Sequence, residues 1–308
     1  MHLRDVYYLV KPVIPRRIRT AVRQAFAIRL RRRFDHCWPI DEASGRVPQD
    51  WPGWPGGKRF AFVLTHDVEG TRGLDRCRQL AQIEINLGFR SSFNFVPEGE
   101  YVTPPSLRSY LNEAGFEVGV HDLHHDGKLY RSREAFEQRA ERINHYLKTW
   151  GAVGFRSAFM LHNLDWLGRL QVQYDASTFD TDPFEPQPDA ANTIFPFWVH
   201  GKNGRPGYVE LPYTLAQDST VFLVFKEPTI DLWTRKLDWV AERGGMVLLN
   251  THPDYMAFGG KPLSDEYPVR FYRELLEYAK KKYQGSYWPA LPSEVAHHML
   301  SHQRKGTT

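Results

Sequence analysis

Beyond Lys58, short apolar runs alternate with longer amphipathic segments almost to the end of the chain. The apolar runs, which are typical of strands, cover residues 60–67, 90–96, 116–120, 154–159, 173–179, 208–213, 245–250 and 286–291. The amphipathic segments, which are typical of helices, cover residues 74–88, 104–115, 132–150, 230–243 and 264–283. Alternation over about 250 residues predicts a parallel sheet covered by helices. The length favours a single (β/α) barrel, and an open doubly wound sheet is the alternative.

Acidic side chains stand where the first apolar run ends. In both candidate folds the functional residues lie at the carboxyl ends of the strands. Asp67 and Glu69 are two residues apart, so in extended backbone they point to the same side. Two carboxylates so placed repel each other unless a cation lies between them or one takes up a proton. An isolated Asp-x-Glu pair is more often a turn or a helix cap.

Two histidines follow the run 116–120. His121 and His125 are four residues apart, a spacing that brings two imidazoles to one point on a helical turn or in a tight loop. Two His and one carboxylate form a common catalytic metal set that leaves positions open for water. Alone, a His-x-x-x-His pair is often a solvated loop or a packing pair.

Arg156 and His252 stand at two further predicted strand ends, in the run 154–159 and just after the run 245–250. Each residue alone indicates little. Polar features at the ends of four predicted strands are much harder to obtain by chance than any one of them. The sequence therefore predicts one catalytic site in which these residues meet.

The order of these motifs resembles that of the polysaccharide deacetylase family, the NodB-type carbohydrate esterases, over residues 58–298. The family's motifs Thr-Phe-Asp-Asp and His-Ser/Thr-x-x-His correspond to Thr65-His66-Asp67-Val68-Glu69 and His121-Asp122-Leu123-His124-His125. Its motifs Arg-x-Pro-Tyr and Leu-x-x-His correspond to Arg156-Ser157-Ala158-Phe159 and Leu249-Asn250-Thr251-His252. The first and third motifs of this chain diverge from the family pattern.

The resemblance implies a distorted (β/α)7 barrel of the NodB type, a divalent metal (usually zinc), and removal of N- or O-acetyl groups from sugars. By the same resemblance, His121 and His125 would match metal ligands. Asp67 would match the general base and His252 the general acid.

The divergent positions leave some roles open. The family's second metal-binding Asp has no match at Val68, and a spaced Asp-x-Asp in some relatives makes Glu69 the better third ligand. Asp67 is the alternative ligand, which would leave the base unassigned. Arg156 would match the residue that orients the base, and Phe159 could still supply the backbone N–H of the oxyanion site.

The fourth motif of the family is the least clear in this chain. Asp175 and Asp182 are both candidates for its acidic residue. The connection 180–207 is unusually long, which suggests a substrate lid or wall. Its aromatic side chains, Trp198 among them, could stack on sugar rings, and a loop held by its own hydrophobic residues is an equally good interpretation.

The net charge is concentrated near the N-terminus. Residues 1–40 hold ten Lys or Arg against two acids, while the whole chain has a net charge of +4. Apolar residues recur every four positions at Ile18, Val22, Phe26 and Leu30, as on one side of a helix. A basic amphipathic helix is typical of a membrane-surface element, and a helix packed on the main domain with solvated arginines is the alternative. We therefore divide the chain into a basic arm with a Pro/Gly-rich linker or wrapping segment, 1–57, and a catalytic barrel, 58–308.

Composition excludes several protein classes. A chain with 42% hydrophobic and 25% charged residues is neither disordered nor fibrous, and two cysteines cannot form a disulfide framework. No apolar stretch approaches the ~20 residues of a membrane span, and charges interrupt the N-terminal apolar pieces too soon for a signal peptide. The basic excess does not continue into the barrel, which argues against a nucleic-acid partner. We expect a cytoplasmic protein, docked on the inner face of the membrane through residues 1–40.

Three functions fit these observations. The first is a zinc-dependent deacetylase that acts on a sugar in a glycan or glycolipid precursor. The second is a metal-independent amide or imide hydrolase on the same barrel. The third is a carbohydrate-binding protein without catalysis.

Overall fold

The computed structural model describes residue 24, residues 27–202 and residues 204–303. Its main strands are β1 Phe60–Val68, β2 Ser92–Phe95, β3 Glu117–His121, β4 Gly154–Arg156, β5 Tyr174–Asp175, β6 Phe197–Val199, β7 Tyr208–Glu210, β8 Met246–Thr251 and β11 Tyr287–Ala290. Its helices are α3 Thr71–Leu87, α4 Pro105–Glu113, α5 Arg133–Trp150, α6 Leu164–Leu167, α7 Asp231–Arg243, α8 Arg270–Tyr283 and α9 Pro292–Gln303. A small separate pair joins β9 Met256–Ala257 to β10 Tyr267–Pro268.

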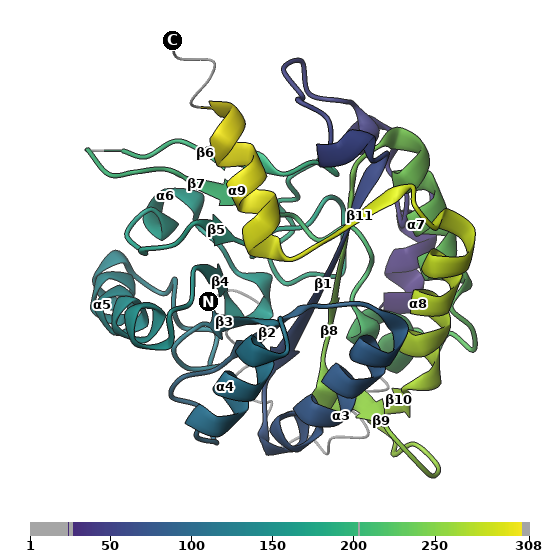
Figure 1. Cartoon of the computed structure of the whole chain (residues 1–308), viewed down its shortest axis with the longest axis horizontal. Helices are drawn as coiled ribbons and strands as arrows, with labels where there is room; N and C mark the ends of the chain where they lie inside the picture. The colour runs from purple at the N-terminus through teal and green to yellow at the C-terminus, as the bar shows by residue number, and fades with distance from the viewer. Residues whose placement is uncertain (1–23, 25–26, 203, 304–308) are drawn as a thin grey trace.

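The main strands form one curled sheet in the order β11-β1-β2-β3-β4-β5-β7-β6, with β8 paired to β1. Each pairing in this sheet is parallel except that of β6 with β7. Isolated bridges join Phe179 to Tyr213 and Leu215 to Leu249, so the sheet closes on itself near β8. Helices α3, α4, α5, α7 and α8 surround it in Figure 1. The distorted (β/α) barrel is confirmed, and the open sheet is wrong.

The distortion of the barrel arises at β1. The lower half of β1 pairs with β11 through residues 60–63, and its upper half pairs with β2 through residues 65–68. The other edge of β1 pairs with β8 through residues 61–66. β11 therefore separates β1 from β2 at the amino end of the strands, while the carboxyl ends stay together.

Most predicted elements are present, with revised ends. The side chain of Ser132 accepts a hydrogen bond from Ala135 N at 3.2 Å and begins α5, as predicted. The predicted helix 264–283 is wrong over its first residues, because Tyr267 and Pro268 form β10 and a residue before proline favours extended backbone. The predicted strand 173–179 shortens to the two residues of β5.

Alternation along β1 sorts its side chains between two hydrophobic cores. Ala61 and Val63 face the barrel interior, where they pack with Val295 and Ala296 of α9 and with Trp54. Other residues of β1 face outward against the helices; they include Phe60, Phe62, Leu64 and Val68. Helix α9 therefore closes the amino end of the barrel, and the carboxyl end is left for the site.

The described part of the N-terminal arm packs on the barrel. Residues 27–33 are helical, and the buried Trp38 meets Phe184 edge-on with ring centroids 4.9 Å apart. Trp54 donates a hydrogen bond to Gly244 O at 2.8 Å. Residues 41–58 are therefore a wrapping segment rather than a free linker. Of the predicted apolar stripe, Ile18, Val22 and Phe26 lie outside the described residues. Across the described residues, we find no helix with the length and apolar character of a membrane span.

Candidate active site

Two carboxylates, those of Asp67 and Glu69, lie where β1 ends at the carboxyl end of the barrel. Asp67 has the same parity as the inward-facing Ala61 and Val63, and Glu69 follows two residues later. Val68, between them, is fully buried in the outer core. The residue at the position of the family's second acid therefore points away from the site, and Glu69 takes its place on the inner side.

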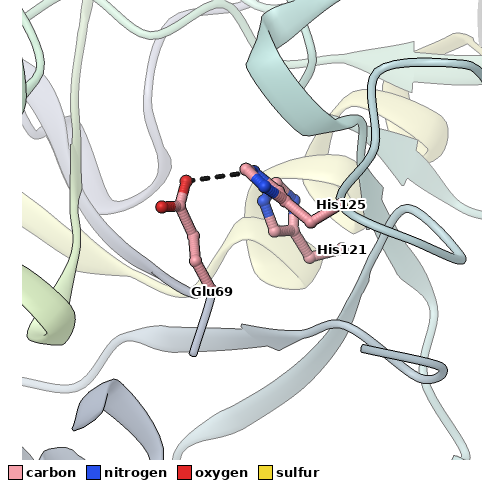
Figure 2. Close-up of side chains that lie close together, drawn as sticks. All are labelled: Glu69, His121 and His125. Carbon is pink, nitrogen blue, oxygen red and sulfur yellow. Dashed lines mark ion pairs between the residues drawn. The ribbon is translucent and has the colours of Figure 1, made fainter. Parts of the chain in front are cut away.

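Glu69, His121 and His125 come together as the sequence predicted (Figure 2). One potential ligand atom from each lies within 4.8 Å of the others. His125 Nε2 lies 3.1 Å from Glu69 Oε1. The hydroxyl of Tyr255 donates to Glu69 Oε2 at 2.7 Å. Two imidazoles and a carboxylate are a donor set suited to zinc and similar divalent metals.

His121 presents an unused lone pair to this group. Its Nδ1 donates to the carbonyl oxygen of Arg156 at 3.0 Å, so the neutral ring carries its proton on Nδ1. Its Nε2 is buried and makes no hydrogen bond to any described residue. Burial lowers the pKa of His121 to about 4 in spite of nearby Asp67. The ring is therefore neutral near pH 7 and fits a metal through Nε2, which explains the buried atom without a partner.

The backbone at Glu69 is held by a buried carboxylate. Asp254 accepts hydrogen bonds from the N–H groups of Glu69 and Gly73, each at 3.0 Å, at the start of α3. A Cβ atom on Gly73 would lie 2.1 Å from Asp254 Oδ2, so only glycine lets the carboxylate approach this closely. Burial raises the pKa of Asp254 to about 6.

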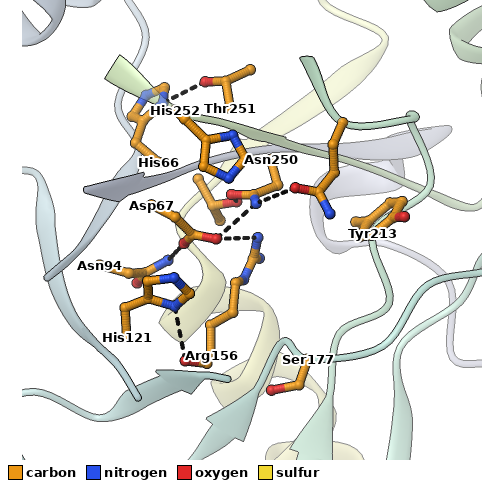
Figure 3. Close-up of polar contacts among 12 residues, drawn as sticks. His66, Asp67, Asn94, His121, Arg156, Ser177, Tyr213, Asn250, Thr251 and His252 are labelled. Carbon is orange, nitrogen blue, oxygen red and sulfur yellow. Dashed lines mark hydrogen bonds and ion pairs between the residues drawn. The ribbon is translucent and has the colours of Figure 1, made fainter. Parts of the chain in front are cut away.

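Asp67 lies next to this group, and both of its carboxylate oxygens accept hydrogen bonds (Figure 3). It accepts hydrogen bonds from Asn94 Nδ2 at 2.9 Å and from Asn250 Nδ2 at 2.8 Å. The buried guanidinium of Arg156 lies 3.7 Å away. Burial alone would raise the pKa of Asp67, but His121, Arg156 and His252 together lower it to about 2. Asp67 is therefore an anion at neutral pH.

His252 favours its protonated, positively charged form, whereas Asp67 favours its anion. Its Nδ1 lies 2.6 Å from Asp218 Oδ1, and its backbone N–H donates to Asp218 Oδ2 at 2.8 Å. Its Nε2 lies 3.6 Å from Glu69 Oε1. Burial alone would lower the pKa of His252, but Asp218 and Glu69 raise it to about 10. A protonated imidazole thus faces the deprotonated Asp67 across the site.

These residues line one cleft of about 790 Å³. Its lining includes Glu69, His121 and His125 together with Asp67 and His252. Its walls come from several parts of the chain and include Gln24, Phe159, Phe184–Pro186 and Leu223–Val224. Phe159 is 42% exposed and has a left-handed φ of 57°, and its ring centroid lies 4.5 Å from that of His125. Backbone strain of this kind clusters at functional sites, which is consistent with a backbone N–H aimed at a substrate here.

Comparisons of the structure with solved structures decide the fold. A protein assigned as a polysaccharide deacetylase from Mycobacterium smegmatis superposes with a TM-score of 0.61 at 19% identity, over 82% of this chain and 93% of that one. The chain has the polysaccharide deacetylase fold. PuuE allantoinase gives a TM-score of 0.60 at 15% identity, over 82% of this chain and 93% of that one. A protein assigned as a polysaccharide deacetylase from Pseudomonas aeruginosa PAO1 gives 0.53 at 15% identity, over 80% and 92%. No protein-family model and no curated protein sequence matches the chain.

Within this polysaccharide deacetylase fold, the two candidates for the fourth-motif acid, Asp175 and Asp182, bind hydroxyl groups of Ser177 and Tyr213, at 2.8 Å and 2.9 Å respectively. Neither carboxylate contacts His252, whereas Asp218 does. Sequence reasoning missed Asp218, because it lies in an irregular segment before the π-helix Ser219–Val224 and carries no motif spacing.

The long connection 180–207 supplies less of the cleft than expected. Of its described residues, Phe184–Pro186 line the cleft, while Ile194 and Phe195 are buried in the core. Trp198 lies on β6 and does not line the cleft, so its expected place at the substrate site is wrong. Residues 184–186 therefore act as a wall of the cleft. Ile194 and Phe195 fit the alternative, in which the loop is held by its own hydrophobic residues.

Proposed function

We propose that this protein is a metal-dependent hydrolase that removes acetyl groups from an N- or O-acetylated sugar in a glycan or glycolipid precursor. The observation that carries the proposal is the unpartnered, buried Nε2 of His121 beside Glu69 and His125. Such an atom is costly to bury unless a ligand completes its bonding. Glu69, rather than Asp67, supplies the carboxylate of the metal set.

The chain's own groups divide the chemistry of amide hydrolysis. A divalent metal held by Glu69, His121 and His125 would polarise the acetyl carbonyl and lower the pKa of a water. Asp67 takes the proton of the attacking water, and the cation of Arg156 keeps that carboxylate oriented. His252 donates its proton to the leaving nitrogen, and Asp218 holds the imidazole in place. The backbone N–H of Phe159 helps to stabilise the oxyanion.

A metal-independent amide or imide hydrolase is the second candidate. What favours it is the similarity in fold to PuuE allantoinase, at a TM-score of 0.60. A fold alone does not determine the reaction, however, and the donor set around His121 is better explained by a metal. A carbohydrate-binding protein without catalysis is the third candidate, and the opposed pKa values of Asp67 and His252 argue against it.

One assay separates the three. The purified protein, stripped of metal and then given zinc, is tested for acetate release from N-acetylated and O-acetylated sugars. We expect release with zinc and none without it. Amide hydrolysis that persists in the stripped protein would favour the second candidate, and sugar binding without release would favour the third.

A membrane partner remains part of this proposal. Ile28, Arg29, Arg32 and Arg33 are exposed on the helical segment beside the cleft wall formed by Gln24 and Leu223. Each basic residue near an anionic surface contributes about 1 kcal/mol, screened by salt. Replacing Arg29, Arg32 and Arg33 by Gln should reduce pelleting with anionic vesicles at low salt. The same change at Arg235, Arg273 and Lys281, also exposed, is the control. Equal pelleting of both variants would leave the arm as a structural brace.

A further inference from the structure

A buried histidine lies directly behind the two proposed proton-transfer residues. His66 precedes Asp67 on β1, and Thr251, the last residue of β8, precedes His252. The register of the two strands pairs His66 with Thr251, and this is the last pair of the β1–β8 ladder. The next residues, Asp67 and His252, no longer pair with each other in this ladder.

The side chains of this last pair bind each other. His66 Nδ1 lies 2.7 Å from Thr251 Oγ1, and both side chains are fully buried (Figure 3). His66 Nε2 lies 2.6 Å from Oε1 of Glu84 on α3. The hydroxyl of Tyr272, on α8, donates to the same Glu84 oxygen at 2.8 Å. We call His66, Thr251, Glu84 and Tyr272 the outer-face network.

The outer-face network is separate from the pocket of Asp67. His66 and Asp67 are consecutive on β1, so their side chains project from opposite faces of the sheet. The ring of His66 packs between Phe93 and Tyr272, with centroid distances of 4.8 and 5.5 Å. A phenylalanine, which the family motif has at this position, could fill the space but could not bind Thr251. The hydrogen bonds therefore add a constraint beyond packing.

We propose that the outer-face network is a positioning device. The hydrogen bond between His66 and Thr251 fixes the position of Asp67 relative to His252 along the direction of the strands. Its role in turnover rests on the proposed function. Buried hydrogen bonds strengthen in a low-dielectric interior, so a bond between the last paired residues limits sliding of the strands. Glu84 also ties this point to α3, the helix that begins two residues after Glu69. One network thus links the strands of the base and the acid to the helix beside the metal set.

Thr251→Val tests the device with little change in volume, because it removes only the hydroxyl. Thr251→Ser retains the hydroxyl and should behave like the wild type. Thr214→Val is the matched control: Thr214 Oγ1 donates to Met246 O at 2.9 Å and accepts from Leu248 N at 3.0 Å, nearer the other end of β8. All three variants are made in the full-length protein.

The first readout is amide hydrogen exchange, which needs no activity. In Thr251→Val, we expect exchange at residues 64–68 and 249–253 to be about tenfold faster than in wild type, since local opening sets this rate. Thr251→Ser and Thr214→Val should leave these segments protected. Unchanged protection in Thr251→Val, or equal loss in Thr214→Val, would overturn the proposal.

The second readout is turnover on the acetylated sugar with zinc. We expect kcat to fall about tenfold or more in Thr251→Val with KM unchanged, because small misplacement of catalytic groups is costly. Thr214→Val, compared well below its melting temperature, should keep its kcat. An unchanged kcat in Thr251→Val would show that the strands need no such device. Faster exchange in a protein whose wild type releases no acetate would contradict the proposed function and leave the strand link intact.

Discussion

The two ends of the barrel are built from the same strands, but one end is packed with apolar side chains and the other holds the polar side chains of the site. At the amino end, Ala61, Val63 and Met246 are fully buried in a hydrophobic cluster that includes Trp54 and residues of α9. At the carboxyl end, a few residues further along the same strands, Asp67 and His252 are equally buried but each is bound by polar partners. Burial of apolar side chains stabilises the fold. Burial of ionisable side chains among polar partners shifts their pKa values, as catalysis requires. The difference predicts that substitutions at the two ends separate stability from activity.

The largest effect is expected at the polar end. Asp67→Asn keeps the size of the side chain but removes the base, and its amide NH2 group replaces an oxygen that accepts from Asn94 or Asn250. We expect turnover to fall about 10² to 10⁴-fold, the range for general acid–base groups. His252→Ala should cut turnover to a similar extent. Steady-state kinetics with zinc present measures this, and a single cooperative thermal transition shows that the variants are folded. Near-wild-type turnover would remove that residue from the mechanism.

The apolar end should respond in the opposite way. Met246→Ala removes a fully buried side chain from the inner core and should lower the free energy of unfolding by about 2–5 kcal/mol. The activity per folded molecule should stay unchanged well below the melting temperature. Denaturant unfolding and kinetics on the same sample provide both values. A marked loss of kcat in a fully folded sample would break the division between the two ends.

The smallest effect concerns the partner of the acid. Asp218→Asn removes the main charge that raises the pKa of His252 to about 10, so this pKa should fall toward its usual value of 6.5. Because the folded-state pKa is raised, the stability that His252 contributes is complete below about pH 6.5 and is lost as the pH rises through about 10. An NMR titration of the metal-free protein measures the shift. A His252 midpoint near 6.5 in wild type would contradict the assigned role of Asp218.

The sequence predicted the parts of the site that follow strand parity and short spacing. Glu69 follows Asp67 by two residues at the end of β1, so both lie on one side, and the turn after β3 brings His125 back to His121. The contact of Asp218 with His252 could not be predicted from the sequence, because it depends on how the irregular segment after β7 folds back over β8. No local pattern in a sequence encodes such a long-range contact.

The elements show the same limit. Ser132 predicted the start of α5, because a helix cap is a local interaction. The residues after β5 were predicted as strand, but the carboxylate of Asp175 accepts the backbone N–H of Ser177 at 3.1 Å and competes with the ladder. Trp198 was placed at the substrate because it is an aromatic residue in a long connection, but it lies on β6 and does not line the cleft.

We propose that Glu69, His121 and His125 hold a divalent metal in the cleft. The most direct test is X-ray diffraction across the zinc absorption edge from crystals of the wild type and of His121→Ala, both purified without chelator and offered zinc. We expect one anomalous peak among these three side chains in the wild type and none there in the variant. A wild-type map without a peak at this position, or a peak that His121→Ala leaves unchanged, would contradict it.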